Sequence, residues 1–269
     1  MSKLTKPQAK KHAEACKLLE QDVLSLEERQ FVLDHWQESA RHVNSVNGAF
    51  FTPSPLARDL SIYVGEGSII DLCAGIGALA FHAIDRFNRT PQRIVCVELN
   101  ADYVAVGRKV VPEATWIRSD VFDLPADLGT FDYAIANPPF GRCKGVPLSG
   151  VPLDLNVVAV AARLARNGVF ILPQESCPFV YSGRGGHRPR QSSAYEKLRA
   201  SVDVVLRCSS IDCRGYRDLW RGVSPSVEIT YFDFDEQELE AEPHVSEVSI
   251  PVAPSPDAPQ LSLFEVARG

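Results

Sequence analysis

Residues 68–80 read Ser-Ile-Ile-Asp-Leu-Cys-Ala-Gly-Ile-Gly-Ala-Leu-Ala, so a short strand-like run at 68–72 passes directly into a turn that contains two glycines. Gly75 and Gly77 let the chain turn tightly and let a ligand approach the backbone closely. The turn therefore predicts a binding site for a nucleotide-like ligand. The spacing of Gly75, Gly77 and Ala80 also meets the loose dinucleotide-binding pattern, which leaves a nicotinamide or flavin enzyme open at this point.

Short strand-like runs continue beyond the glycine turn and alternate with helical stretches. They lie at 93–98, 114–118, 132–136 and 169–173. This alternation predicts a parallel sheet with helices on both faces. The runs 202–208 and 226–234 are expected to add an antiparallel hairpin at one edge. We therefore predict an α/β fold, a Rossmann-like doubly wound sheet of about seven strands that is mostly parallel.

Helices are predicted around this sheet. Residues 155–167 are nearly all apolar and precede Gly168, which suits the left-handed stop of a helix, so we expect a buried helix that ends there. The first 47 residues read as a helical extension. Ser25 and Glu28 form a capping-box pattern, and apolar residues then recur at helical spacing through Trp36 and beyond.

Length and composition define the class of protein. The 269 residues are 45% hydrophobic and 23% charged, which is ordinary for a soluble globular chain. No apolar run approaches the roughly 20 residues of a membrane helix, and the N-terminus lacks the apolar stretch of a secretory signal. We therefore expect a cytoplasmic protein without membrane association. Seven cysteines with no Cys-x-x-Cys pair indicate neither a disulfide framework nor a metal site.

The net charge of −6 is unevenly distributed along the chain. Nine acidic residues and one arginine lie between Asp233 and Gly269, which leaves a net charge of +2 on the rest. Residues 235–269 are rich in Glu, Pro, Ser and Ala without periodicity, so we expect this tail to be disordered. The expected domain, 48–234, together with the extension 1–47, is mildly basic, which permits binding to nucleic acid through local patches.

Two acidic residues follow the strand-like runs next to the glycine turn. Glu98 ends the run 93–98, 21 residues after Gly77, where a carboxylate accepts hydrogen bonds from ribose hydroxyls in nucleotide-binding folds. Asp120 follows the run 114–118, and its carboxylate suits a hydrogen bond from an adenine amino group. Taken by itself, Asp120 is equally well explained as a turn or helix-cap aspartate.

Residues 131–141, Phe-Asp-Tyr-Ala-Ile-Ala-Asn-Pro-Pro-Phe-Gly, indicate the chemistry. Pro138 and Pro139 fix two φ angles directly after a strand and make a stiff loop. The Asn137 side-chain oxygen and the Pro138 carbonyl then accept both hydrogens of one planar NH₂ group. This favours a pyramidal nitrogen and so stabilises the transition state. Phe140 offers a flat apolar face to a planar substrate. Turn chemistry alone is the less favoured explanation.

These motifs together resemble the class I S-adenosylmethionine-dependent methyltransferases, and among them the amino-methylating enzymes marked by Asn-Pro-Pro-aromatic. The resemblance covers about residues 48–234 and implies S-adenosylmethionine as the cofactor. The catalytic tetrapeptide that it implies is Asn137, Pro138, Pro139 and Phe140. The residues that it implies for cofactor binding are Phe51, Thr52, Asp71, Cys73, Ala74, Gly75, Gly77, Glu98, Leu99, Asp120, Val121 and Asn137.

Residues 48–53, Gly-Ala-Phe-Phe-Thr-Pro, resemble the element of N6-adenine DNA methyltransferases that precedes the glycine turn and lines the methionine end of the cofactor. The order of this element, the glycine turn and the Asn-Pro-Pro-Phe tetrapeptide is similar to the gamma arrangement of those enzymes. The chain departs from them in one respect, because it has no room for a sizeable target-recognition domain. Contacts to DNA are therefore expected from loops.

Two basic loops are candidates for these contacts. Arg184, Arg188 and Arg190 follow the run 169–173 and are placed to contact phosphates. The second loop contains Arg214, Arg217, Trp220 and Arg221, and Trp220 is expected to stack on or wedge beside an extruded base. For each arginine alone, a solvated surface charge is the simpler explanation.

The tail ends with a short apolar motif. Gln260, Leu261, Ser262, Leu263 and Phe264 resemble the bacterial sliding-clamp-binding motif, in which a glutamine and a Leu-x-Leu-Phe cluster dock into a groove of the replication clamp. These side chains have no core of their own to join within an acidic, Pro-rich linker. The resemblance therefore implies recruitment to the clamp, and folding back onto the chain's own domain is the alternative.

We expect an enzyme that methylates the N6 amino group of adenine in DNA by direct transfer from S-adenosylmethionine to a flipped-out base. The same tetrapeptide suits other delocalised NH₂ groups, so an RNA adenine N6- or protein glutamine N5-methyltransferase is the first alternative. A non-catalytic nucleic-acid-binding protein with a cofactor fold is the second.

Overall fold

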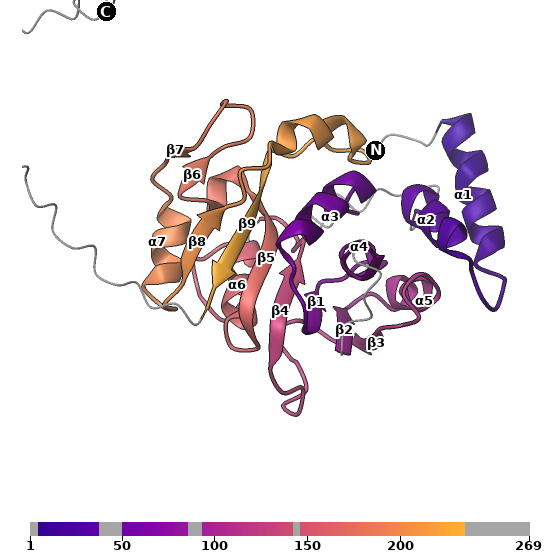
Figure 1. Cartoon of the computed structure of the whole chain (residues 1–269), viewed down its shortest axis with the longest axis horizontal. Helices are drawn as coiled ribbons and strands as arrows, with labels where there is room; N and C mark the ends of the chain where they lie inside the picture. Colours follow the sequence, from indigo (N-terminus) through magenta and orange to yellow (C-terminus); the bar gives the residue numbers. More distant parts are fainter. Residues whose placement is uncertain (1–4, 38–49, 86–92, 142–145, 235–269) are drawn as a thin grey trace, which may run out of the picture. The chain divides into compact units, whose positions relative to one another are not determined.

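The computed structural model describes residues 5–37, 50–85, 93–141 and 146–234. At its centre is a sheet with the strand order β3-β2-β1-β4-β5-β9-β8 (Figure 1). The strands are β1 (Ser68–Leu72), β2 (Arg93–Glu98), β3 (Thr115–Arg118), β4 (Phe131–Ala136), β5 (Ala165–Pro173), β8 (Val205–Cys208) and β9 (Val227–Asp233). The first five pair in parallel, and β9 lies antiparallel between β5 and β8.

The predicted doubly wound sheet with an antiparallel edge pair is confirmed. The chain runs outward from β1 through β2 to β3 and then returns to place β4 on the other side of β1. Ligands of open α/β sheets bind at such a reversal of strand order, outside the carboxyl ends of the strands. The glycine turn follows β1 and Asn137 follows β4, so both lie at this edge.

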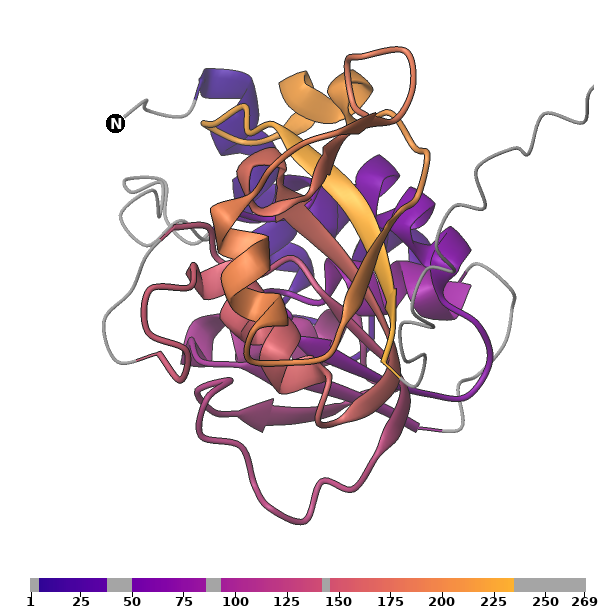
Figure 2. The same ribbon diagram turned by 90° about the vertical axis from the view of Figure 1, so that its left-hand side faces the viewer.

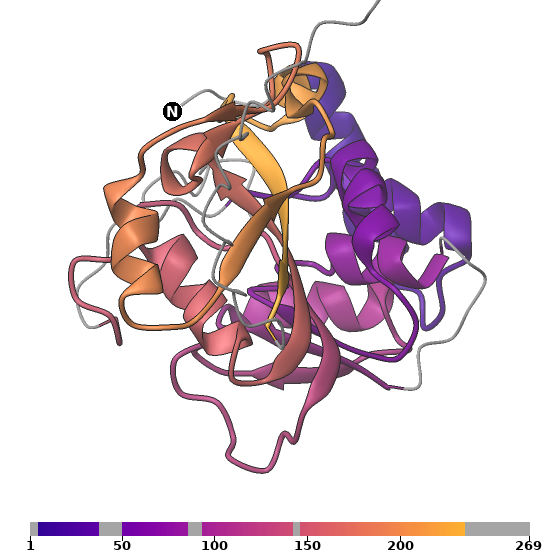
Figure 3. The same cartoon turned by 60° about the vertical axis from the view of Figure 1, so that its left-hand side comes forward.

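Helices cover both faces of the sheet (Figures 1 and 3). One face carries α3 (Ser54–Leu60), α4 (Ala78–Asp85) and α5 (Ala101–Val110), and the other carries α6 (Leu153–Ala161) and α7 (Ser193–Arg199). Successive strand residues point to opposite faces. Ile69 and Cys96 therefore join the apolar core on the first face, while Ile70 and Val97 join the core on the second.

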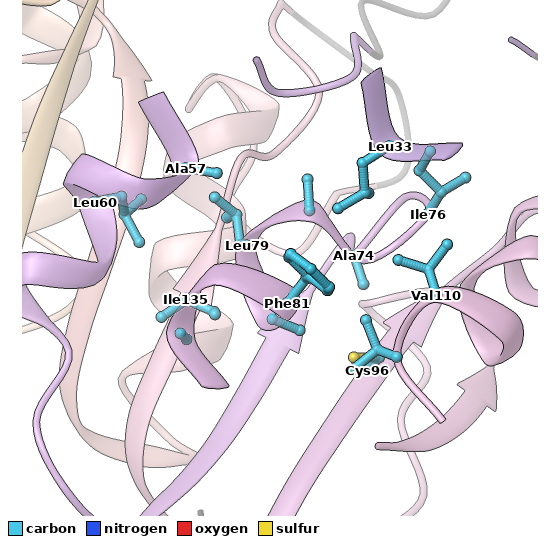
Figure 4. Close-up of a cluster of buried hydrophobic side chains, with 14 of the residues drawn as sticks. Leu33, Ala57, Leu60, Ala74, Ile76, Leu79, Phe81, Cys96, Val110 and Ile135 are labelled. Carbon is cyan, nitrogen blue, oxygen red and sulfur yellow. The ribbon is translucent and has the colours of Figure 1, made fainter. Parts of the chain in front are cut away.

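The N-terminal helices pack onto the first of these cores. They are α1 (Lys6–Leu18) and α2 (Leu26–His35), and α2 begins with the predicted capping box of Ser25 and Glu28. Leu33 of α2 points toward the glycine turn near Ile76 (Figure 4). The prediction that the helix continues through Trp36 is wrong. Trp36 has extended backbone (φ −71°, ψ 142°), and its ring packs edge-on against Tyr103 of α5.

The buried helix α6 ends earlier than predicted. It stops at Ala161, and Gly168 lies inside β5, paired with Ala134 of β4 and Phe232 of β9. A Cβ atom at position 168 would lie 2.4 Å from the Phe170 ring, so glycine makes room there for aromatic side chains. An all-apolar run suits a buried helix and a buried strand equally, and periodicity therefore did not place the boundary.

The structure also bears on the expectations about membrane helices and cysteines, whereas those about the tail concern residues that it does not describe. No helix in the described ranges is long and apolar enough to cross a membrane. The six cysteines within those ranges are free thiols. The tail 235–269, with Gln260–Phe264, and the end of the N-terminal extension lie outside the described residues.

Candidate active site

The turn between β1 and α4 places main chain, rather than side chains, at the carboxyl edge of the sheet. Cys73, Gly75 and Gly77 have φ angles of 63°, 58° and 91°, in the left-handed region that favours glycine. A Cβ atom at Gly77 would lie 2.7 Å from the Val111 side chain, so this position has no space for a larger residue. The predicted ligand-binding turn is therefore a closely packed segment of main chain at the end of β1.

Glu98 ties this turn to the end of β2. Its Oε2 accepts a hydrogen bond from the Gly75 amide at 2.8 Å, and its Oε1 accepts one from the Asn100 amide at 2.8 Å. Burial raises the pKa of Glu98, and these two hydrogen bonds oppose the rise. Each oxygen retains a further lone pair for a ligand hydroxyl. Leu99 follows with 63% of its surface exposed, an apolar face next to the carboxylate.

Asp71 lies beneath the turn. Its carboxyl group is buried, and Oδ2 accepts a hydrogen bond from the amide of Ala80 in the first turn of α4 at 3.2 Å. Burial raises the pKa of Asp71 well above its usual range, and the nearby charge of Glu98 adds to the rise. Asp71 thus links β1 to the first turn of α4 across the glycine turn.

The predicted acidic residues converge around one thiol. The pKa of Cys73 is raised well above its usual range, first by burial and then by the charges of Glu98, Asp71 and Asp120. Asp120 is exposed, and its Oδ1 accepts a hydrogen bond from the Phe122 amide at 2.9 Å, which forms the turn that was one of its two interpretations. This turn uses one carboxyl oxygen. Val121, next in the chain, is half-buried against the second core.

The Asn137 side chain is held in one orientation. Its Nδ2 donates to the Phe50 carbonyl at 3.1 Å and to the Thr52 hydroxyl at 2.9 Å. The Phe50 carbonyl can only accept, which identifies the nitrogen end of the amide. Oδ1 is buried and has no hydrogen-bond partner among the described residues. Buried acceptors are ordinarily satisfied, so this oxygen has the capacity to accept a further hydrogen bond.

Phe50 is the functional residue that sequence reasoning missed. Its carbonyl orients Asn137, and its ring lies 6.3 Å from the Phe140 ring at an angle of 58°. The sequence pointed to the segment 48–53 as a whole, but a backbone contact leaves no side-chain signal that distinguishes Phe50 within it. The Phe51 ring packs against the glycine turn, 3.7 Å from the position that a Cβ of Gly75 would take.

The two basic loops also come together. Arg184 of the first loop lines a pocket with Arg214 and Arg217 of the second. Arg188 is exposed in the short strand β7 (Arg188–Pro189), and Arg190 donates to the Gln174 carbonyl at 3.1 Å.

The prediction that Trp220 stacks on an extruded base is wrong. Trp220 is 5% exposed and belongs to the apolar core of the first sheet face. Burial of its large apolar ring leaves no open face for a base. The neighbouring Arg221 is also structural, because its guanidinium donates to the carbonyls of Leu33 and Trp36 at the end of α2.

Comparison with known proteins rests on structure alone. No protein-family model and no curated protein matches the sequence. Among solved structures, a protein from Pyrococcus horikoshii assigned as an RNA methyltransferase is 16% identical, covers 77% of this chain and 97% of its own, and gives a TM-score of 0.51. A protein from Listeria monocytogenes assigned as a class I S-adenosylmethionine-dependent methyltransferase is 12% identical, with 85% and 73% covered and a TM-score of 0.51.

A third structure is the methyltransferase subunit of a type I restriction-modification system from Streptococcus thermophilus. It is 17% identical, with 77% of this chain and 47% of that chain covered and a TM-score of 0.51. The fold is that of the class I methyltransferases. At these identities the likeness establishes the fold alone. A fold does not determine the reaction, which depends on the residues of the site.

The residues at the carboxyl edge fit S-adenosylmethionine. The turn at Gly75 and Gly77 leaves the backbone open to a ligand, and the Glu98 carboxylate suits a ribose diol. Exposed Leu99 suits the face of an adenine ring, and the second oxygen of Asp120 suits its amino group. All of these groups lie at the carboxyl ends of the strands, next to the point where the strand order reverses. Ligands bind at this point in open α/β sheets.

Proposed function

We propose that this chain is an S-adenosylmethionine-dependent methyltransferase that modifies the N6 amino group of adenine in DNA. The observation that carries the proposal is the environment of Asn137. Phe50 and Thr52 hold its amide nitrogen, and its Oδ1 is buried without a partner among the described residues. An acceptor fixed in this way suits a substrate N–H donor.

The chain's own residues act on the target amine. Asn137 Oδ1 and the Pro138 carbonyl accept its two hydrogens, which withdraws the nitrogen lone pair from the ring and directs it out of the plane. S-adenosylmethionine supplies an electrophilic methyl group. As the nitrogen–carbon bond forms, the amine would displace the cofactor's sulfur, to which the electron pair of the broken sulfur–methyl bond returns, and one proton would leave the amine for solvent. Because these hydrogen bonds strengthen as the nitrogen becomes pyramidal, they lower the barrier rather than only tighten binding.

Two sequence features favour DNA over RNA adenine and protein glutamine as the substrate. The order of Phe-Thr-Pro, glycine turn and Asn-Pro-Pro-Phe is similar to that of gamma-type DNA adenine methyltransferases. The segment Gln260–Phe264 resembles a sliding-clamp-binding motif, and we propose that it recruits the enzyme to replicating DNA.

The test is methyl transfer by the purified protein with labelled S-adenosylmethionine. We expect label in unmodified DNA rather than in an RNA of matched sequence or in protein. Asn137→Ala should lose most turnover, since the lost interaction belongs to the transition state, and should keep its cofactor affinity by calorimetry. Label in RNA or in glutamine would contradict the DNA assignment, and collapse of cofactor affinity in Asn137→Ala would make Asn137 a structural residue.

A further inference from the structure

A pocket of about 200 Å³ lies where the two basic loops meet. Arg184 reaches it from the loop after β6 (Phe179–Val180), and Arg214 and Arg217 reach it from the 3₁₀ helix η4 (Cys213–Leu219). Figure 2 shows this loop and η4 at the same end of the molecule, beyond the start of β9. Three arginines from segments about thirty residues apart thus line one cavity, and the Arg217 guanidinium also donates to the Ser224 carbonyl at 3.4 Å.

These guanidinium groups lack a protein counter-ion. All three arginines are exposed, and none forms an ion pair with a carboxylate in the part of the chain that the structure describes. Two acidic residues belong to η4 and its N-cap. Asp218 lies within η4, and Asp212 is the N-cap, whose Oδ1 accepts hydrogen bonds from the amides of Gly183 at 3.0 Å and Arg214 at 2.9 Å. Guanidinium forks without a carboxylate partner match the oxygens of a phosphate group.

A buried carboxylate holds the walls of the pocket in place. Glu228 of β9 is 1% exposed and accepts hydrogen bonds from Gln174 Nε2 at 2.8 Å, from the Ser182 hydroxyl at 2.7 Å and from the amides of Tyr181 and Ser182. The Ser182 oxygen in turn accepts from the Cys213 amide at 2.8 Å, which joins the first loop to η4. The pocket is therefore pre-organised, which lowers the entropic cost of binding.

The pocket shares its edge of the sheet with Asn137. Asn137 follows β4, β5 pairs with β4, and β9 pairs with β5. Two strand spacings, about 10 Å, separate the pocket from the Asn137 site across the sheet. Along the strands the pocket is offset further, because Ala136 pairs with Phe170 and the pocket begins at Gln174, which adds about 10 Å. This separation suits the backbone of a strand whose extruded base occupies the Asn137 site.

We infer that Arg184, Arg214 and Arg217 bind a phosphodiester of the polynucleotide strand that carries the target base. The inference rests on the proposed function, because it assumes a nucleic-acid substrate. Glu228 is a positioning residue, which fixes the loop of Arg184 without contacting the phosphate.

The test is the salt dependence of binding to a single-stranded DNA oligonucleotide. In Arg184→Gln/Arg214→Gln, the slope of log K against log salt should flatten by up to about 0.7, because the three arginines share one phosphate and each phosphate contact contributes about 0.7 for single strands. The control is Arg163→Gln/Arg166→Gln, which removes the same charge from exposed positions at the opposite end of β5. The control should keep the parental slope.

The outcomes separate the inference from the proposed function. Parental DNA binding and methylation with an unchanged slope in the pocket variant would overturn the phosphate site alone, as would an equal flattening in the control. Absence of any DNA binding by the parent would overturn both. Cofactor affinity, which should equal that of the parent, verifies that each variant is folded. Arg217→Gln, a single exposed substitution that should flatten the slope by part of this amount of about 0.7, repeats the test if the double variant fails to fold.

Discussion

Asn137 owes its orientation to residues 85 and 87 positions earlier in the chain. Thr52→Val removes the hydroxyl that accepts from Asn137 Nδ2, and one hydrogen bond contributes about 1 kcal/mol. We therefore expect kcat to fall about fivefold with little change in cofactor affinity, as measured by steady-state kinetics and calorimetry. Thr52→Ser keeps the hydroxyl and should keep the rate. Loss of cofactor affinity at parental kcat would contradict this orienting role and would support the cofactor contact that the sequence resemblance implies for Thr52.

Glu98 is expected to hold the ribose diol of the cofactor. Glu98→Gln removes the charge from these hydrogen bonds, which contribute about 1.5–3 kcal/mol. The dissociation constant for S-adenosylmethionine, measured by calorimetry, should therefore rise about 10- to 150-fold. Asp102→Asn removes an exposed acid four residues away on α5 and serves as the control. An unchanged dissociation constant in Glu98→Gln would remove Glu98 from the cofactor site.

At the scale of elements, α6 carries a titratable group inside the protein. The amide of Leu153 donates to the Gly141 carbonyl at 2.8 Å, so the start of this helix adjoins the segment after the tetrapeptide. Burial raises the pKa of the neighbouring Asp154 to about 6, and the Ser176 hydroxyl opposes part of this rise. The folded chain therefore holds this proton more tightly than the unfolded chain, and Asp154 stabilises the fold least at neutral pH.

The consequence is a pH-dependent stability. The free energy of unfolding of the parent should fall by about 2 kcal/mol between pH 4.5 and 7.5 relative to Asp154→Asn, because only the parent loses this proton in that window. Urea denaturation at the two pH values measures the difference. Asp127→Asn, at an exposed position, should follow the parent. Identical pH profiles for Asp154→Asn and the parent would contradict the account.

The bounds of strands and helices could be predicted best where a residue with a local structural role ends the element. β1 and β2 have the predicted bounds because the glycine turn ends one and Glu98 ends the other. The stop of α6 was missed, since Gly168 serves the packing of Phe170 rather than a helix end. The end of α2 was missed because Trp36 leaves the helix to pack against Tyr103, a contact that no local pattern encodes.

At the scale of the whole molecule, parallel topology accounts for the predictable part of the site. Residues that follow β1, β2 and β4 must meet at one edge, so Gly75, Glu98 and Asn137 could be grouped from the sequence. The pocket of Arg184 and Arg214 could not, because it depends on how two loops pack together. The role expected of Trp220 failed for the same reason, since its burial is decided by tertiary packing.

The tail carries a prediction about a partner. Burial of Leu263 and Phe264 in an apolar groove is worth about 1.5–3 kcal/mol each before ordering costs, so a peptide of residues 258–269 should bind a bacterial sliding clamp weakly. A clamp and an enzyme on the same duplex raise each other's effective concentration. Leu263→Ala/Phe264→Ala should abolish clamp binding and preserve methylation of naked DNA. Absence of clamp binding by the full-length protein at micromolar concentrations would contradict recruitment.

The central claim is that Asn137 presents an acceptor to the amino group of adenine in DNA. The most direct measurement is nucleoside mass spectrometry of DNA from a methylation-free host that expresses the protein. The account predicts N6-methyldeoxyadenosine with the parental chain and none with Asn137→Ala at equal expression. DNA without N6-methyldeoxyadenosine, from cells in which the parental chain is folded and binds S-adenosylmethionine, would contradict it.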